Sequence, residues 1–167
     1  MTDIKAFLYG IDNAGKTAIS ETIKHETTFN NTRPTVRVMI SQTLIKNLNF
    51  FIWDLPGQTS LRNKWIKALE KSELLLFILD TADNERFTEA KKEFYSILSN
   101  PESKGIPLVF CFHKMDLQDA RNNLPEAQTE FGLENIKDRQ INILETSINQ
   151  LSTIEELKDK MVSIFLD

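Results

Sequence analysis

Apolar runs of strand length alternate along this chain with stretches of helical periodicity. Short apolar runs that stop at glycine, proline or polar residues predict strands at residues 4–9, 36–45, 48–53, 74–79, 106–112 and 140–144. Apolar positions spaced three and four residues apart predict helices at residues 16–25, 61–71, 85–98, 125–131 and 152–165. For the last helix, Ser152 followed by Glu155 is the pattern of an N-terminal capping box.

The order of these elements is typical of a sheet flanked by helices. The fourth and fifth predicted strands are continuously apolar, as in strands covered on both faces. Two residues separate the second predicted strand from the third, so this pair is expected to form an antiparallel hairpin. We therefore expect an α/β fold: one domain over residues 1–167, with a six-stranded, mostly parallel sheet, one antiparallel edge strand and about five helices on both faces.

Composition narrows the class of protein. The 20 Lys+Arg and 24 Asp+Glu residues give a net charge of -4. Nucleic-acid-binding modules usually carry an excess of positive charge, so this composition argues against that class of protein. The single cysteine, Cys111, has no partner for a disulfide or a zinc cluster. The longest apolar stretch, residues 74–79, is far shorter than the ~20 residues of a membrane span. With no signal peptide, no myristoylation glycine and no C-terminal cysteine in this sequence, we expect a cytoplasmic protein without a direct lipid anchor.

A phosphate-binding motif directly follows the first predicted strand. Residues 10–17 read GIDNAGKT and fit the pattern G-x-x-x-x-G-K-[ST]. In such a loop, glycines let successive backbone N–H groups surround a phosphate, the lysine reaches the outer phosphates, and the hydroxyl binds Mg²⁺. The helix that follows aims its positive end at the same anion. The sequence predicts a nucleoside triphosphate with Mg²⁺, its phosphates held by Asp12, Asn13, Ala14, Gly15, Lys16 and Thr17, and Thr17 also on the metal.

A second motif ends the third predicted strand, where residues 53–58 read WDLPGQ. Asp54 lies at the end of a strand beside the first one, where a carboxylate can hold Mg²⁺ through a water molecule. The N–H of Gly57 can approach a γ-phosphate without interference from a Cβ, and Gln58 can orient an attacking water. A plain Pro-Gly turn is the alternative interpretation.

A third motif, HKMD at residues 113–116, ends the fifth predicted strand. Asp116 can accept hydrogen bonds from N1–H and the 2-amino group of guanine, which adenine lacks, while the stem of Lys114 covers the face of the base. A buried carboxylate without a partner is costly, so such a site rejects adenine.

In order and spacing these motifs resemble those of the Ras-superfamily small GTPases, through residues 10–17, 34–35, 54–58, 114–116 and 145–147. The interior of the phosphate loop is similar to the Arf and Arf-like branch, whereas residues 53–58, 113–116 and 146–148 are similar to Rag/Gtr GTPases. The resemblance implies the small-GTPase P-loop fold. It also implies a molecular switch that binds GTP or GDP with Mg²⁺ and hydrolyses GTP slowly.

The resemblance implies roles for further residues. Gln58, Lys16 and Thr35 would be catalytic, and Thr35 would bind the metal when GTP is bound. Switch I would span about residues 28–38 and switch II about 55–70. The base would be held by His113, Lys114, Asp116, Ser147 and Ile148. Effector, exchange and activating proteins would bind the switch regions. A roadblock-domain protein or a second Rag-like GTPase is a further expected partner, and membrane recruitment would pass through partners.

One of the base-site residues departs from the usual small-GTPase pattern. His113 replaces the asparagine that ties the base loop to the phosphate loop, and its titration is expected to make nucleotide affinity depend on pH near 6 to 7. Arg33, two residues before Thr35, is either a solvated arginine or an arginine finger in cis.

Trp53 and Cys111 are expected in the core, whereas Trp65 is either a core residue or a nucleotide-gated contact.

Two other functions also fit the motifs. A nucleotide-bound scaffold that does not cycle is compatible with Pro56 and with the missing asparagine. A P-loop kinase would need a phosphate-acceptor site and a basic lid, and the sequence contains no arginine-rich segment of that kind.

Overall fold

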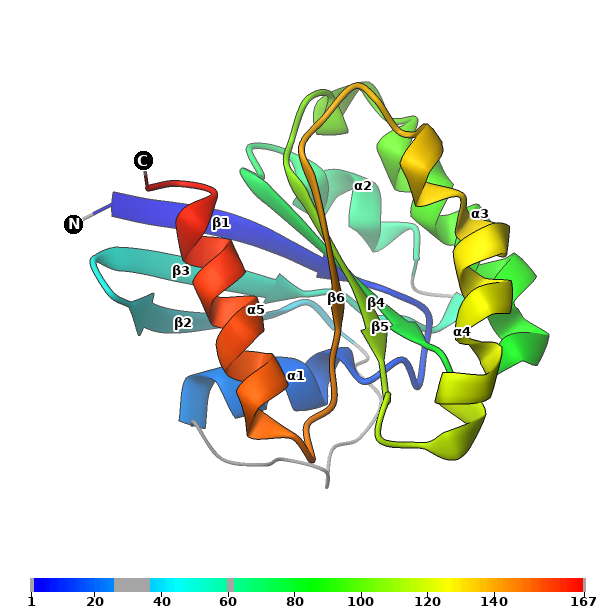
Figure 1. Cartoon of the computed structure of the whole chain (residues 1–167). Coiled ribbons are helices and arrows are strands. Elements are labelled where there is room, and N and C mark those ends of the chain that lie inside the picture. Colours follow the sequence, from blue (N-terminus) through cyan, green and yellow to red (C-terminus); the bar gives the residue numbers. More distant parts are fainter. Residues whose placement is uncertain (1, 26–36, 60–61, 167) are drawn as a thin grey trace.

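The computed structural model describes residues 2–25, 37–59 and 62–166, which contain six strands and five α-helices (Figure 1). The strands are β1 (Thr2–Tyr9), β2 (Met39–Ile45), β3 (Leu48–Asp54), β4 (Leu74–Asp80), β5 (Leu108–His113) and β6 (Ile141–Glu145). The helices are α1 (Lys16–His25), α2 (Lys64–Leu69), α3 (Phe87–Leu98), α4 (Gln118–Phe131) and α5 (Leu151–Ser163). In this part of the chain, no helix is both long and apolar enough to cross a membrane.

All six strands lie in one sheet, in the order β2-β3-β1-β4-β5-β6. β2 runs antiparallel to β3, and every other pair of neighbouring strands is parallel. The expected α/β fold with one antiparallel edge strand is therefore confirmed. Because the five parallel strands end at the same edge, the loops that follow them are brought together there (Figure 1).

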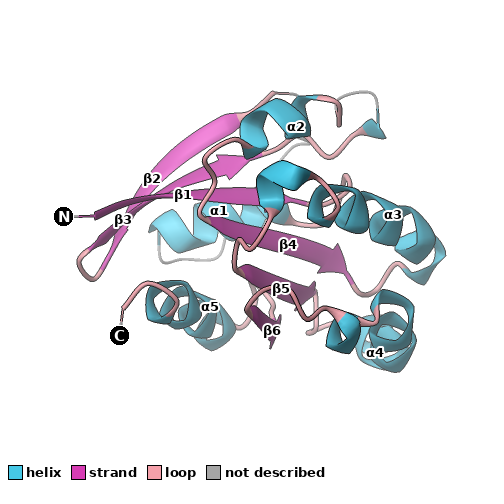
Figure 2. Cartoon of the chain, turned by 90° about the horizontal axis from the view of Figure 1, so that it is seen from above, coloured by secondary structure: helices cyan, strands magenta, loops and turns pink. Residues whose placement is uncertain are grey.

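Helices cover both faces of the sheet (Figure 2). α2, α3 and α4 pack on one face over a cluster of aromatic rings, in which the Phe94 centroid lies 4.8 Å from Phe77 and 5.2 Å from Phe110. α1 and α5 cover the other face with aliphatic side chains such as Ile19 and Leu157. Burial of each such large side chain contributes about 2–3 kcal/mol, so these layers hold the strand ends in fixed positions.

Two predicted helix starts were wrong. α4 begins at Gln118 rather than at residue 125, and Pro125 lies inside it. A proline removes one N–H from a helix, but the buried side chains Ala120, Ala127 and Phe131 hold both halves of α4 on the sheet. α5 begins at Leu151 with Gln150 as its N-cap, so Ser152 lies within the helix and forms no capping box.

Candidate functional site

The phosphate loop, defined as residues 10–17, connects β1 to α1 at the carboxyl edge of the sheet (Figure 1). Asn13 and Gly15 both have positive φ angles, 64° and 104°. Asparagine and glycine tolerate this conformation, which turns successive N–H groups toward one side. α1 begins directly at Lys16, so the positive end of its dipole lies at the same place. The six residues predicted to hold phosphates, 12–17, thus form a turn and a helix start whose N–H groups can bind an anion.

Lys16 is buried although it carries a charged side chain. Burial lowers its pKa, and the nearby carboxylates of Asp54 and Asp12 act in the opposite direction. A buried ammonium group at a helix N-terminus is a strong attractor for a polyanion, because little water screens it. This placement agrees with the predicted phosphate contact of Lys16.

Thr17 and Asp54 meet beside the phosphate loop. The Thr17 hydroxyl donates a hydrogen bond of 2.6 Å to Oδ2 of Asp54, which is the last residue of β3 and is buried. A hydroxyl and a carboxylate oxygen are the ligand types that Mg²⁺ takes when phosphates and water supply the rest. These residues therefore fit a magnesium ion. The third predicted ligand, Thr35, lies outside the described residues, as do Arg33 and most of predicted switch I.

At the other end of the site, the carboxylate of Asp116 receives two hydrogen bonds. Ser147 donates through its hydroxyl to Oδ1 at 2.7 Å, and the Asn149 side-chain amide donates to Oδ2 at 3.0 Å. Burial alone would raise the pKa of Asp116, but these hydrogen bonds outweigh it and lower the pKa. The group stays ionised and oriented, with acceptor sites left for further donors. Ile148 lies between the two donors in the sequence, and its contact with the base stays a prediction.

Lys114 connects the base end to the phosphate end. Its ammonium group donates to the backbone oxygen of Asn13 at 2.8 Å and to Oδ2 of Asp80 at 2.9 Å. The φ angle of Lys114 is 66°, in the left-handed region that few non-glycine residues adopt. Sequence reasoning missed Asp80 and Asn149. Asp80 was detectable as the carboxylate that ends a fully apolar strand, whereas Asn149 had no comparable signal.

His113 packs directly on the phosphate loop. A Cβ added at Gly15 would lie 2.7 Å from Cδ2 of His113, so no other residue fits at Gly15 without displacing the ring. Nδ1 of His113 lies 2.9 Å from the Thr146 hydroxyl, in hydrogen-bond contact. The expected titration of His113 near pH 6 to 7 is wrong. Burial is the main cause that lowers its pKa to about 3, and the charge of Lys114 adds to the effect.

This burial predicts how stability changes with pH. The folded-state pKa of His113 lies below the unfolded value of about 6.5, so its contribution is complete above pH 6.5 and is lost as pH falls toward 3. Between pH 7.5 and 5.5, His113 should cost about 1.4 kcal/mol of unfolding free energy. Denaturant titrations at both values should show this loss in the wild type and not in His113→Asn. An equal pH dependence in both proteins would contradict the neutral, buried histidine.

The segment that follows β3, through Gly57, packs against the phosphate loop. Asp12 donates its backbone N–H to the Gly57 carbonyl at 2.9 Å, and a Cβ at Gly57 would lie 2.6 Å from that nitrogen. Gln58 follows with a half-buried side chain. Trp65 is 1% exposed, packs edge-on against Tyr9 and donates to the Pro56 carbonyl at 2.7 Å. Trp65 is therefore a core residue in this conformation.

The two remaining core predictions had different outcomes. Cys111 is fully buried in β5, as predicted. Trp53 is only half-buried, and the ammonium group of Lys5 lies 3.9 Å from the centroid of its ring. β3 has a single strand, β2, beyond it, so its side chains near that edge receive less cover than those of β4 or β5. Trp53 therefore forms a cation–π contact at the border of the core.

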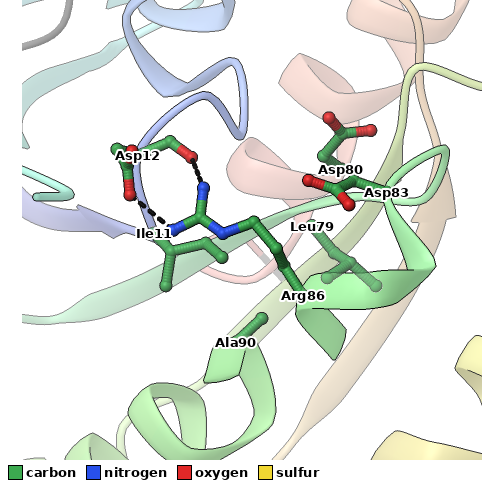
Figure 3. Close-up of a pocket in the computed structure, with 7 residues that line it drawn as sticks. All are labelled: Ile11, Asp12, Leu79, Asp80, Asp83, Arg86 and Ala90. Carbon is green, nitrogen blue, oxygen red and sulfur yellow. Dashed lines mark hydrogen bonds and ion pairs between the residues drawn. The ribbon is translucent and has the colours of Figure 1, made fainter. Parts of the chain in front are cut away.

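A cluster of five charged side chains beside the phosphate loop was not predicted. Its members are Asp12, Arg62, Arg86, Glu89 and Glu93. Arg86 donates to the backbone oxygen and to the carboxylate of Asp12, at 3.0 and 2.6 Å, beside a small pocket (Figure 3). The five members come from three separate segments of the chain, so no local pattern in the sequence indicates the cluster.

Comparisons with known proteins agree with this geometry. The model of the ADP-ribosylation factor family matches residues 1–165. ADP-ribosylation factor-like protein 1 of Drosophila melanogaster is 31% identical over 94% of this chain and 86% of its own length. ADP-ribosylation factor-like protein 6 of Danio rerio is 33% identical, over 82% of this chain and 75% of its own.

A solved structure shares the fold. It is that of the Arl6 BBS3 small GTPase from Trypanosoma brucei with the nucleotide analogue GppNp, with a TM-score of 0.77, 19% identity, and coverage of 97% of this chain and 98% of that one. The matches decide between the alternatives in favour of a GTPase that works as a GTP-dependent switch. The chain belongs to the ADP-ribosylation factor family of small GTPases.

Proposed function

We propose that this GTPase reads guanine through Asp116, holds the phosphates in residues 10–17 and reports the γ-phosphate through the segment that begins at Gly57. The observation that carries the proposal is the meeting of these three groups at one edge of the sheet. Lys114 bridges the first two, and the Asp12–Gly57 hydrogen bond joins the second to the third. A ligand that spans base and phosphates would contact all three at once.

Roles for single residues follow from this placement. Lys16 neutralises the outer phosphates, and Thr17 with Asp54 holds Mg²⁺, the latter through water. Mg²⁺, when bound, neutralises charge that develops on the transferred phosphoryl group. Gln58 orients the attacking water, and Thr35 is a further metal ligand with GTP bound. Ser147 and Ile148 complete the base site, with the Ile148 N–H directed at guanine O6.

Output passes through the switch segments, residues 28–38 and 55–70. We propose that effector, exchange and activating proteins bind these segments, because the γ-phosphate would change the contacts that the segments make with the nucleotide. A roadblock-domain protein or a second Rag-like GTPase as partner remains a prediction, as does a cytoplasmic location with membrane recruitment through partners. The Rag/Gtr-like features of residues 53–58 and 113–116 support the first of these.

The direct test is to purify the protein, release its nucleotide and identify it by chromatography. We expect GDP or GTP, followed by phosphate release from added GTP on a scale of ~10⁻⁴ s⁻¹ without a partner. Excess ATP should not displace labelled GTP, because adenine lacks the N1–H and the 2-amino group that would donate to Asp116. Displacement by ATP, or absence of guanine-nucleotide binding, would refute the proposal.

A further inference from the structure

Arg62 is a buried arginine in the predicted switch II segment. Its side chain is 7% exposed, and it interacts with three elements of the fold. Nε donates to the Gly57 carbonyl at 3.0 Å, and Nη2 donates to Glu89 of α3 at 2.6 Å. Nη1 lies 3.4 Å from Glu93 of α3, and Nη2 lies 3.7 Å from Asp12 of the phosphate loop. An arginine that is desolvated this far must be fixed by its partners, because its charge is costly without them.

The contact with Gly57 fixes the peptide that precedes Gln58. The Gly57 carbonyl belongs to the Gly57–Gln58 peptide bond, and it accepts from Arg62 as well as from the Asp12 N–H at 2.9 Å. Two donors on one carbonyl set the orientation of the peptide plane. They therefore also set the position from which the Gln58 side chain extends.

α3 supplies the rigid anchor for this arrangement. Glu89 binds Arg62 and Arg86 together, and Arg86 reaches back to the backbone and carboxylate of Asp12 (Figure 3). The hydrogen bonds from Arg86 and Arg62 overcome the effect of burial and lower the pKa of Glu89, which stays ionised. The phosphate loop, through Arg86, and Gly57, through Arg62, are thus both connected to Glu89 in the first turn of α3.

We propose that Arg62 is a positioning residue for GTP hydrolysis, which holds the Gly57–Gln58 peptide against the phosphate loop and thereby places Gln58. The inference rests on the proposed role of Gln58. Arg62 itself does not touch the reacting atoms in this arrangement. It acts through the peptide, and a lysine cannot replace it, because a single ammonium group cannot reproduce the fork that joins Gly57 to Glu89.

The test compares single-turnover GTP hydrolysis with GDP affinity. Arg62→Ala should slow hydrolysis by about 10- to 100-fold, as expected when a reacting group is misplaced by about 1 Å, while GDP affinity stays within about threefold. Arg62→Lys should recover less than half of the lost rate. In a Gln58→Leu background, Arg62→Ala should cause no further loss, because both substitutions remove the same positioned group. Lys92→Ala, on the exposed side of α3, is the charge-matched control and should hydrolyse at the wild-type rate.

Two results would overturn the inference: a wild-type rate in Arg62→Ala, or an equal slowing in the Gln58→Leu background, which would show that Arg62 acts independently of Gln58. Loss of Arg62 leaves Glu89 and Glu93 close together, so Arg62→Ala with Glu89→Gln provides a second variant if the first does not fold. Bound GDP and thermal unfolding report folding in each case. A wild type that binds no GTP would instead refute the proposed function, so the two failures are distinguishable.

Discussion

Asp116→Asn is expected to change the base preference of this protein from guanine to xanthine. The Asp116 carboxylate can accept from both N1–H and the 2-amino group, whereas an asparagine presents one acceptor and one donor. Guanine loses two charge-assisted hydrogen bonds and faces donor against donor, so GDP affinity should fall on the order of 10³-fold. Xanthine carries a carbonyl oxygen at C2, which accepts from the new amide. Competition of labelled GDP by unlabelled GDP and XDP measures the change.

The local hydrogen bonds allow this substitution without loss of the fold. Ser147 donates to one carboxylate oxygen and Asn149 to the other. The asparagine oxygen can still accept from Ser147, and the Asn149 amide can rotate to present its own oxygen. Asp119→Asn, at an exposed position of α4, is the matched control and should retain guanine preference. If Asp116→Asn keeps GDP affinity within a few-fold and gains none for XDP, guanine is not read by Asp116.

The linear motifs of the site could be predicted because their chemistry is local. Residues 10–17 carry the glycine, lysine and hydroxyl of a phosphate loop within one turn. Asp54 and Asp116 each lie where an apolar run gives way to polar residues. Parallel strands then bring these three segments to one edge, whatever the packing of individual side chains. Topology therefore turned three separate sequence patterns into one site.

What the sequence could not predict depends on burial and on distant partners. The ordinary pKa of histidine suggested titration near neutral pH, but His113 is enclosed between Gly15 and Thr146 and stays neutral. Pro125 looked like the first turn of a helix, yet tertiary packing carries α4 through it. Arg62 pairs with Glu89, which lies 27 residues further along the chain, and with Glu93 beyond it. Nothing near Arg62 in the sequence therefore indicates these ion pairs.

Gln58→Leu is expected to remove the acceleration of GTP hydrolysis by an activating partner. Leucine has a similar size but can neither donate to nor accept from a water molecule, so the attacking water loses its orientation. The single-turnover rate without a partner should fall about 10²-fold, and the ~10⁵-fold stimulation typical of this class of switch should be lost. GDP affinity should stay unchanged, because Lys16, Thr17 and Asp116 are untouched.

The matched control for this experiment is Gln128→Leu, the same substitution at an exposed position of α4. This control should hydrolyse GTP at the wild-type rate, which would separate the loss of an oriented water from a general effect of added apolar surface. The placement of Gln58 favours the specific effect, since the preceding Gly57 lies so close to Asp12 that a Cβ there would meet the phosphate-loop backbone at 2.6 Å. Hydrolysis by Gln58→Leu at the wild-type rate would mean that a group other than Gln58 directs the attacking water.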